Sequence, residues 1–312
     1  MESKLTKRGF KKKTIEQTIR EKIKGWLGSI EDIELRDVIR KHYIVTGGAI
    51  TSMLQGDLPN DYDVYLDDAD VAARLANYYI SRLPAVENEK TATPIVEIPP
   101  ERNRVTIKVQ SAGITGEEVE QDEYDYFESY PNASARMEQY LNGAANRDTG
   151  KYTALAITTN AITLSDKVQI VLRFVGPARE IHKNYDFVHT TNYYTEEEGV
   201  VLNQPALESI LAKELKYVGS LYPICSMFRI KKFIQRGWTI TAGEMLKIAW
   251  DISKLDLNNR DVLQDQLTGV DAAYFNQLIR LLGEGQEIDR TYLFELVNRV
   301  FDQNWEEEGE TE

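Results

Sequence analysis

The sequence predicts an α+β protein, in which a small mixed sheet with flanking helices is followed by an all-helical C-terminal domain. Short strand-like runs alternate with helical spacings as far as residue 203, and helical spacings dominate afterwards. The length of 312 residues and the hydrophobic content of 42% favour two domains over one. We therefore expect basic N-terminal helices over residues 1–42, an α/β domain over 43–203, a helical domain over 204–305 and an acidic, disordered tail over 306–312.

Two kinds of spacing predict the individual elements. Apolar residues three and four apart predict helices at Thr14–Lys24, Glu31–His42 and Val71–Leu83, and a helix of about two turns in GGAITSMLQG. Alternating or β-branched runs predict strands at Tyr43–Val45, in DYDVYL, in two extended pieces between Pro94 and Val109, and in a hairpin around Leu164–Lys167. In the C-terminal region, helical spacing predicts Ala206–Val218, Tyr222–Gln235, Ala242–Ile252 and Tyr292–Trp305.

Charge is distributed unevenly along the chain. The formal net charge of −13 argues against a protein that coats nucleic acid through a general basic surface. Residues 1–25, however, carry nine Lys and Arg against three Asp and Glu, so this basic arm is either a phosphate-contacting tail or a solvated helix. Acidic residues crowd positions 117–128, and we expect an insertion near residues 115–146 that adds little to the core.

Composition also excludes several classes of site and location. One cysteine, Cys225, cannot form an internal disulfide, and three scattered histidines do not make a zinc site. No run approaches the roughly 18 apolar residues of a membrane span, and no apolar stretch follows the basic N-terminus as in a secretory signal. We therefore expect a cytoplasmic protein without a membrane partner.

A pair of aspartates carries most of the functional information. Asp61 and Asp63 are two positions apart in a predicted strand, so they project from one face about 6.5–7 Å apart along the backbone. Two carboxylates on one face repel each other unless a cation lies between them. Gly47 and Gly48, which precede a predicted helix, would let backbone amides approach a triphosphate. Together these residues are typical of a metal-dependent phosphoryl-transfer site.

The stretch GGAITSMLQGDLPNDYDV resembles, without a gap, the signature of the polymerase-β-type nucleotidyltransferases, and specifically their tRNA nucleotidyltransferase and bacterial poly(A) polymerase branch. Three later blocks resemble segments of that branch in the same order: YDFVHTTNYYTEEEGVVLN, ALESILAKELKYVG and MFRIKKFIQRGWTIT. The resemblance implies a nucleotidyltransferase head followed by a helical neck and body. It further implies an NTP substrate, Mg²⁺ or Mn²⁺ as cofactor, and RNA as a partner that the basic N-terminal arm and the helical domain would contact.

The same resemblance implies the site residues. Asp61 and Asp63 would be catalytic metal ligands, and Asp186, in YDF, would be a further catalytic carboxylate. The nucleotide would meet Gly47, Gly48 and the pair Thr51 and Ser52, which stand where the family has Arg-Asp. Three basic residues either supply positive charge to a triphosphate or RNA backbone or form a solvated face: Arg173, Arg229 and Lys232.

The chain departs from the family's pattern at several positions. The third carboxylate is expected on the strand VQIVLRF, but that strand offers the neutral Gln169, which leaves Asp186, Asp166 and Glu97 as candidates. The family's Arg-Arg-Asp-Phe is Asn184 to Phe187 here, and YPICS stands where the family reads the incoming base. The aromatic run NYDFVHTTNYY either stacks bases or builds core.

Three functions therefore stay open at the level of the sequence. The first is a nucleotidyltransferase that moves a nucleoside monophosphate from an NTP to an acceptor hydroxyl, with an RNA 3′ end as the expected acceptor. The second is a binding or structural protein that keeps the fold without catalysis, as Gln169 and Thr51 suggest. The third is a nucleotidyltransferase that modifies a protein or a small molecule.

Overall fold

A computed structural model describes residues 8–82, 94–109, 151–157 and 160–259, and the single residues Val262, Leu263, Gln266, Phe294 and Asn298. The chain divides into two compact units, residues 1–216 and 217–312, which are described separately. The expected acidic insertion near 115–146, the helix at Tyr292–Trp305 and the tail at 306–312 lie outside the described residues, apart from Phe294 and Asn298. Within the described part of the chain, no helix has the length and apolarity needed to cross a membrane.

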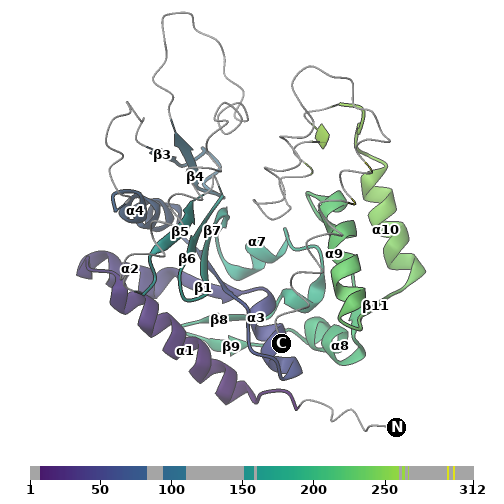
Figure 1. The fold of residues 1–312 in the computed structure, drawn as a ribbon, viewed down its shortest axis with the longest axis horizontal. Helices are drawn as coiled ribbons and strands as arrows, with labels where there is room; N and C mark the ends of the chain where they lie inside the picture. The colour runs from purple at the N-terminus through teal and green to yellow at the C-terminus, as the bar shows by residue number, and fades with distance from the viewer. Residues whose placement is uncertain are drawn as a thin grey trace, which may run out of the picture. The chain divides into compact units, whose positions relative to one another are not determined.

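The first unit has α+β structure (Figure 1). Its helices are α1 (Lys12–Ser29), α2 (Ile33–His42), α3 (Gly48–Gln55), α4 (Ala69–Ile80), α7 (Ala178–His182), the 3₁₀ turn η1 (Val188–Thr190) and α8 (Gln204–Ala212). Its strands are β1 (Tyr43–Thr46), β2 (Tyr62–Leu66), β3 (Pro94–Glu97), β4 (Thr106–Val109), β5 (Ala154–Ile157), β6 (Ala161–Leu164), β7 (Val168–Val175), β8 (Tyr193–Thr195), β9 (Gly199–Val201) and β10 (Glu214–Leu215). This unit confirms the α+β class that the sequence predicts.

One mixed sheet organises the first unit. Seven strands follow the order β5-β6-β7-β2-β1-β8-β9, in which β2 and β7 run parallel and all other neighbouring pairs run antiparallel. The strands β3 and β4 form a separate antiparallel hairpin. The parallel β2–β7 pair places two strands that are far apart in sequence side by side at the middle of the sheet. Asp63, one of the two predicted metal ligands, lies on β2, and Asp61 immediately precedes this strand.

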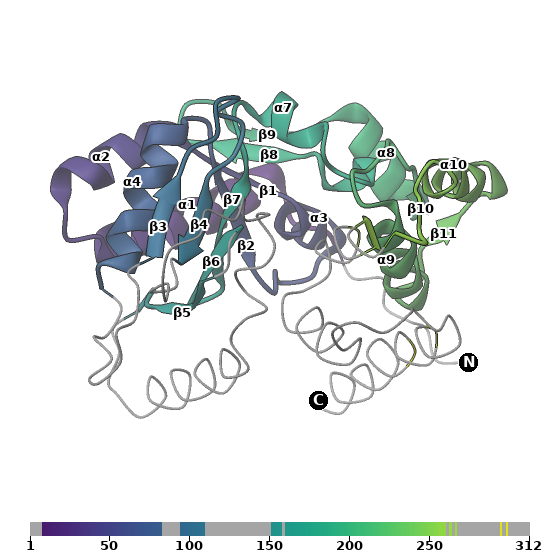
Figure 2. The same cartoon turned by 90° about the horizontal axis from the view of Figure 1, so that it is seen from above.

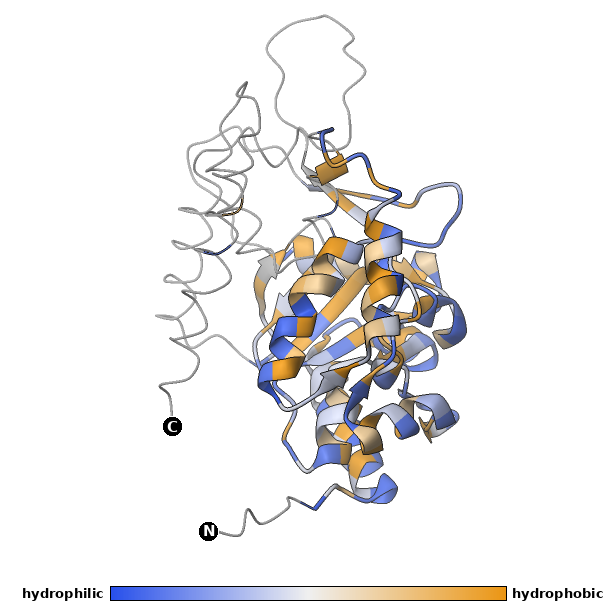
Figure 3. Ribbon diagram, turned by 90° about the vertical axis from the view of Figure 1, so that its right-hand side faces the viewer, coloured by the Kyte–Doolittle hydropathy of each residue, from blue (hydrophilic) through white to orange (hydrophobic). Residues whose placement is uncertain are grey.

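The two faces of the sheet are covered differently. On one face, α1, α2 and α4 pack against the even-numbered residues of β2 and β7 and bury a large core. This core includes Ile19 on α1, Ile39 on α2, Leu75 on α4, Val64 on β2 and Ile170 on β7. On the other face, the short helix α7 covers a small cluster with Ile44, Tyr65, Ala178, Ile181 and Tyr185. Figure 2 shows α2 and α4 to the left of the strands, and Figure 3 shows that the helices carry both hydrophobic and hydrophilic residues. The second face is therefore the one on which polar side chains such as Asp63 lie.

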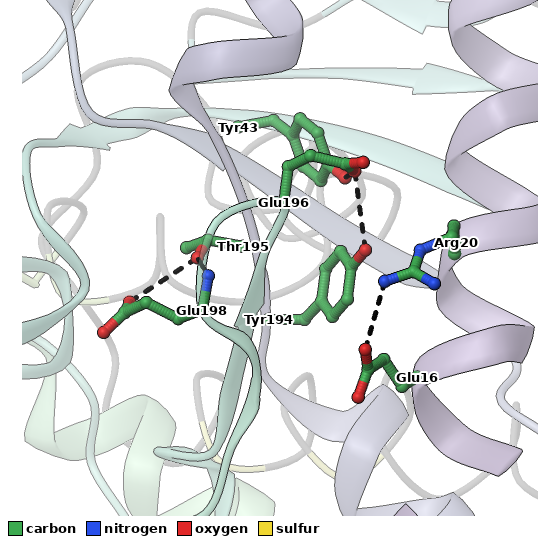
Figure 4. Close-up of polar contacts among 7 residues, drawn as sticks. All are labelled: Glu16, Arg20, Tyr43, Tyr194, Thr195, Glu196 and Glu198. Atoms are coloured by element: carbon green, nitrogen blue, oxygen red, sulfur yellow. Dashed lines mark hydrogen bonds and ion pairs between the residues drawn. The ribbon is translucent and has the colours of Figure 1, made fainter. Parts of the chain in front are cut away.

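The helix α1 lies close to the turn between β8 and β9 (Figure 4). The buried hydroxyl of Tyr43 donates to Glu196 Oε2 at 2.6 Å, and Tyr194 donates to the same oxygen at 3.5 Å. The two tyrosine rings stack with centroids 6.2 Å apart. Burial, and then the hydrogen bond to Glu196, raises the pKa of Tyr43. Beside them on α1, Arg20 pairs with Glu16 at 3.1 Å. These contacts connect the edge of the sheet to β1.

Several predicted boundaries change in the structure. The helix expected at Ala206–Val218 ends at Ala212 because Lys213 adopts a left-handed conformation with φ of 49° and caps it. The helix expected at Thr14–Lys24 extends to Lys12–Ser29. The short helix α7 and the turn η1 were not expected from the sequence. The remaining predicted helices and strands of the described region are present within a few residues of their expected bounds.

The described part of the second unit is mainly helical. The helix α9 (Pro223–Gln235) begins with a proline, which is favourable in the first turn, and α10 (Ala242–Ile252) begins after Thr241, whose side chain accepts a hydrogen bond from the Glu244 amide. Between them lies the short strand β11 (Thr239–Ile240). The expected helices at Tyr222–Gln235 and Ala242–Ile252 are confirmed.

Candidate active site

The glycine turn after β1 lies directly against Asp63. Gly47 has φ of +99°, a conformation that favours glycine, and α3 begins at the next residue. A Cβ atom added to Gly47 would lie 2.7 Å from Asp63 Oδ2, whereas one added to Gly48 would meet nothing within 4 Å. The sequence therefore needs a glycine at position 47 for two reasons, the backbone conformation and the close approach of a carboxylate.

Asp63 lies on the side of β2 that faces away from the main core. Tyr62 and Val64 are buried in the core under α1, so the alternation of a strand turns Asp63 to the opposite face. Asp63 is half-buried, and Asp61, which immediately precedes the strand, is exposed. The structure thus offers a partly shielded carboxylate, Asp63, beside the glycine turn and an exposed one, Asp61, at the start of β2.

Gln169 occupies the position across from Asp63 on the neighbouring strand. In the parallel pair of β2 and β7 the two residues are register partners, and Gln169 is also paired with Thr163 on β6. The expectation that β7 brings a neutral residue to this position is confirmed. Of the other candidates for a third carboxylate, Asp166 lies in the β6–β7 turn, where its carbonyl accepts from Lys22 Nζ at 2.9 Å, and Glu97 ends β3.

The loop that follows Asp186 is hydrogen-bonded to the glycine turn. The Gly47 amide donates to the Thr190 carbonyl at 3.2 Å, and Thr51 Oγ1 donates to the His189 carbonyl at 2.8 Å. Asp186 is half-buried at the start of this loop. Burial lowers the pKa of His189 to about 4, and the negative charge of Asp186 acts on that pKa in the opposite direction. The structure therefore brings Asp186 into the segment beside the turn, while its assignment as the third metal ligand stays a prediction.

A half-buried histidine that contacts the end of β1 was not found from the sequence. His182 Nε2 lies 2.9 Å from Thr46 Oγ1, and the Thr46 hydroxyl also lies 2.9 Å from the Asn192 carbonyl. Because a carbonyl only accepts, the threonine hydrogen goes to Asn192 and the imidazole must donate from Nε2. Burial lowers the pKa of His182 to about 4, which keeps it neutral at physiological pH. The contact joins residues 136 apart in sequence, which no local pattern reveals.

The remaining predicted site residues have different surroundings. Thr51 is buried with its hydroxyl bonded inside the protein, Ser52 is half-buried on α3, and Arg173 is half-buried on β7. Arg229 and Lys232 belong to α9 in the second unit, so their role at this site stays a prediction. Tyr185, Phe187 and Tyr194 of the aromatic run are buried, which supports core building over base stacking.

The donor set suits a hard divalent cation that shares its ligands with a substrate. Asp61 and Asp63 offer carboxylate oxygens, and Gln169 beside them offers an amide oxygen. Among the residues that the structure describes, no group of three or more His, Cys, Asp and Glu side chains comes together as a metal site. Mg²⁺ is commonly held by one or two carboxylates together with substrate phosphates, so the pair fits an ion that arrives with a nucleotide.

Comparison with known proteins places this chain in a family. The model of the Gabija anti-defense 2 family matches residues 17–213, which is more than half of the chain. The protein named Gabija anti-defense 2 from Bacillus phage SPbetaL7 is 24% identical over 180 residues, which cover 57% of this chain and 43% of that protein. The chain therefore matches less than half of the length of this relative.

Two solved structures are also similar. A CCA-adding enzyme in complex with ATP is 11% identical, with a TM-score of 0.40, and the match covers 95% of this chain and 60% of that one. The Thermotoga maritima CCA-adding enzyme complexed with tRNA is 12% identical, with a TM-score of 0.39, and the match covers 93% of this chain and 62% of that one. The family whose model matches is not the tRNA nucleotidyltransferase and poly(A) polymerase branch that the motifs resemble: the chain belongs to the Gabija anti-defense 2 family.

Proposed function

We propose that the first unit is a metal-dependent nucleotidyltransferase that moves a nucleoside monophosphate from an NTP to an acceptor hydroxyl. The approach of Asp63 to the Gly47 turn is the observation that supports this proposal most. A glycine turn that opens a helix favours phosphate, and paired carboxylates favour a divalent cation. The two features meet within one strand–helix–strand unit.

In the proposed reaction the acceptor oxygen forms a bond to the α-phosphorus. The bond from that phosphorus to the bridging oxygen of the β-phosphate breaks, pyrophosphate leaves, and the hydroxyl proton passes to solvent. Asp61 and Asp63 would hold Mg²⁺ or Mn²⁺, which would supply positive charge to the phosphate oxygens. Gly47 and the first turn of α3 would receive the phosphates, since the N-terminal end of a helix favours negative charge.

The acceptor is proposed from the chain's charge and its family. The basic arm and the helical second unit support an RNA 3′ end, whereas the net charge of −13 supports a protein or a small molecule. The name of the phage relative describes that protein as an anti-defense factor against Gabija. We infer that nucleotidyl transfer by this chain serves the same purpose, inside a cell and in contact with a component of that defense.

A second candidate function is a non-catalytic binding protein with the same fold. Gln169 beside Asp63 supports it, because a neutral amide in place of a carboxylate removes a full charge from the metal site. The Thr51 hydroxyl supports it as well, because it bonds to the His189 carbonyl and supplies no cation to a phosphate. In this alternative the protein would bind its partner without transferring a nucleotide.

The two candidates differ in the fate of a labelled α-phosphate. The full chain is incubated with each α-³²P-labelled NTP, Mg²⁺ or Mn²⁺, and either total RNA or a protein extract from cells that carry Gabija. Nucleotidyl transfer predicts label in RNA or protein from an α-labelled but not from a γ-labelled NTP. A chain that counters Gabija in cells while it transfers no label from any NTP would favour the binding protein.

A further inference from the structure

Two buried threonines lie on either side of the Gly47 turn. Thr46 ends β1 and is 0% exposed, and Thr51 lies near the start of α3 and is 6% exposed. Both hydroxyl groups donate into the same neighbouring segment, residues 189–192. The two side chains therefore make contacts inside the protein, although they flank the turn that is proposed to receive phosphates.

Three hydrogen bonds fasten the turn to that segment. The donors and acceptors are Thr46 Oγ1 and the Asn192 carbonyl at 2.9 Å, the Gly47 amide and the Thr190 carbonyl at 3.2 Å, and Thr51 Oγ1 and the His189 carbonyl at 2.8 Å. The donors stand before, within and after the turn, so the bonds fix its two ends and its backbone. Two of the three donors are side chains, and each of these can be removed by a substitution that leaves the backbone unchanged.

The accepting segment is itself held by a different element. Asn192 is 0% exposed, and its side-chain oxygen accepts from the Asn203 amide at 2.9 Å. The Asn203 side chain donates to the Thr191 carbonyl at 2.6 Å. Asn203 is the residue that precedes α8, so these bonds join the segment to the start of that helix without involving the turn. Residues 189–192 are therefore a support on which the turn rests.

The orientation of the first turn of α3 decides where its amides point. Gly47 caps this helix and has no side chain that could accept from the first amides, which in any α-helix lack partners within the helix. Glycine also leaves the backbone at the cap free to take many conformations. A helix of eight residues behind such a cap needs further contacts to keep its orientation, and the Thr51 hydroxyl supplies one.

We propose that the Thr46 and Thr51 hydroxyls are positioning groups for the nucleotide, which hold the Gly47 turn and the first amides of α3 in the orientation that receives its phosphates. Neither hydroxyl would touch the nucleotide, because both donate to carbonyls inside the protein. The proposal rests on the proposed function, since it needs the turn to bind phosphate. It assigns to Thr51 a role that differs from the direct nucleotide contact implied by its place in the motif.

Valine and serine substitutions separate the hydroxyl from the shape of the side chain. Thr51→Val keeps the branched shape and removes the hydroxyl, whereas Thr51→Ser keeps the hydroxyl. Calorimetric titration of the full chain with the α,β-methylene analogues of the four NTPs and Mg²⁺ measures the affinity. We expect about tenfold weaker binding for Thr51→Val and binding within about twofold of the wild type for Thr51→Ser, since a misplacement of about 1 Å can cost about 100-fold.

Thr46→Val and Thr46→Ser make the same comparison on the other side of the turn, and they decide the question if Thr51→Val does not fold. The matched control is Tyr43→Phe, which removes a buried hydroxyl from the opposite end of β1, where it donates to Glu196 at 2.6 Å. The valine variants and Tyr43→Phe should all have a Tm a few degrees below that of the wild type. Tyr43→Phe should nevertheless bind the analogues as the wild type does.

The outcomes separate a positioning role from a merely structural one. Weaker binding that is confined to the valine variants supports the proposal. If the folded valine variants bind as tightly as the wild type, or if the serine variants lose as much affinity as the valine variants, the proposal is wrong and the proposed function stands. Equal losses in Tyr43→Phe and Thr51→Val would also overturn it, because affinity would then follow stability. If the wild type binds none of the four analogues, the proposed function fails and this inference fails with it.

Discussion

Asp63 and Gln169 are register partners on two parallel strands, and this pairing decides how strong the candidate metal site is. A carboxylate on β7 would face the same cation as Asp63, whereas an amide offers oxygen without charge. The side chains come from strands more than one hundred residues apart, which the sheet order brings together. The electrostatics of the site can therefore be changed by one substitution of nearly equal size.

The substitution Gln169→Glu should tighten divalent-cation binding. A unit charge a few ångströms from the ion contributes about 1 kcal/mol even at the dielectric constant of water, and that energy corresponds to about fivefold in affinity. Without metal, the new carboxylate repels Asp63, so the apo protein should lose stability. Calorimetric titration with Mn²⁺ and the metal-dependent rise in Tm measure both effects. Equal metal affinities for the variant and the wild type would show that Gln169 does not face the ion.

The substitution Gly47→Ala should damage the site and the fold together. At φ of +99° a side chain is strained, and the added carbon would lie 2.7 Å from Asp63 Oδ2. We expect a loss of about 2–3 kcal/mol in the free energy of unfolding, together with weaker metal binding. The matched control is Gly48→Ala, which meets nothing within 4 Å and should be neutral or stabilising by up to about 1 kcal/mol. Urea unfolding of the two variants compares them, and equal losses would contradict the explanation.

The neutral His182 should make stability depend on pH. Its pKa is about 4 in the folded chain because of burial, against an ordinary value of 6.5. Between these values the unfolded chain binds more protons, so stability should fall as the pH is lowered from about 6.5 to about 4, and this group contributes no pH dependence above that window.

The variant His182→Gln isolates this contribution. Its amide nitrogen donates to Thr46 as the imidazole does but does not titrate. The wild type should lose about 1–2 kcal/mol more than the variant between pH 7 and pH 4.5, after allowance for partial exposure. His189, which also has a pKa of about 4, stays in both proteins and cancels in the comparison. Parallel stability curves for the two proteins over this range would refute the effect.

The contact between Tyr43 and Glu196 should contribute to the stability of the sheet edge and leave the site unaffected. Tyr43 is 2% exposed and donates to a carboxylate at 2.6 Å. Tyr43→Phe should cost about 1–2 kcal/mol in the free energy of unfolding, since hydrogen bonds to charged groups are among the stronger ones. Tyr193→Phe, whose exposed hydroxyl contacts Glu198 at 3.3 Å, should cost less than about 0.5 kcal/mol. A Tyr43→Phe variant that unfolds at the same urea concentration as the wild type would show that the contact is not stabilising.

Much of the site's framework can be predicted from local patterns. The strand, glycine turn, helix and strand between Tyr43 and Leu66 follow from apolar spacing, and the ungapped resemblance from Gly47 to Asp63 predicts that the turn and the aspartate lie side by side. The strand with Gln169 is also predicted, as one arm of a β-hairpin around Leu164–Lys167 whose arms are rich in β-branched residues.

Other features depend on contacts that local patterns do not contain. The end of α8 depends on Lys213, a residue type that rarely takes positive φ, so helical spacing overran it by six residues, from Ala212 to Val218. The His182–Thr46 contact and the burial of Tyr185 arise only when α7 folds over the sheet. A helix of five residues has too little periodicity to be recognised in advance.

The most direct test of the central claim compares the wild type with Asp61→Asn and Asp63→Asn in the transfer of α-³²P label from an NTP to RNA or protein. If the two carboxylates hold the catalytic cation, each variant should lose more than about 100-fold in transfer rate while its Tm stays close to that of the wild type. Label transfer at the wild-type rate by either folded variant would contradict the assignment of Asp61 and Asp63 as the metal ligands of a nucleotidyltransferase.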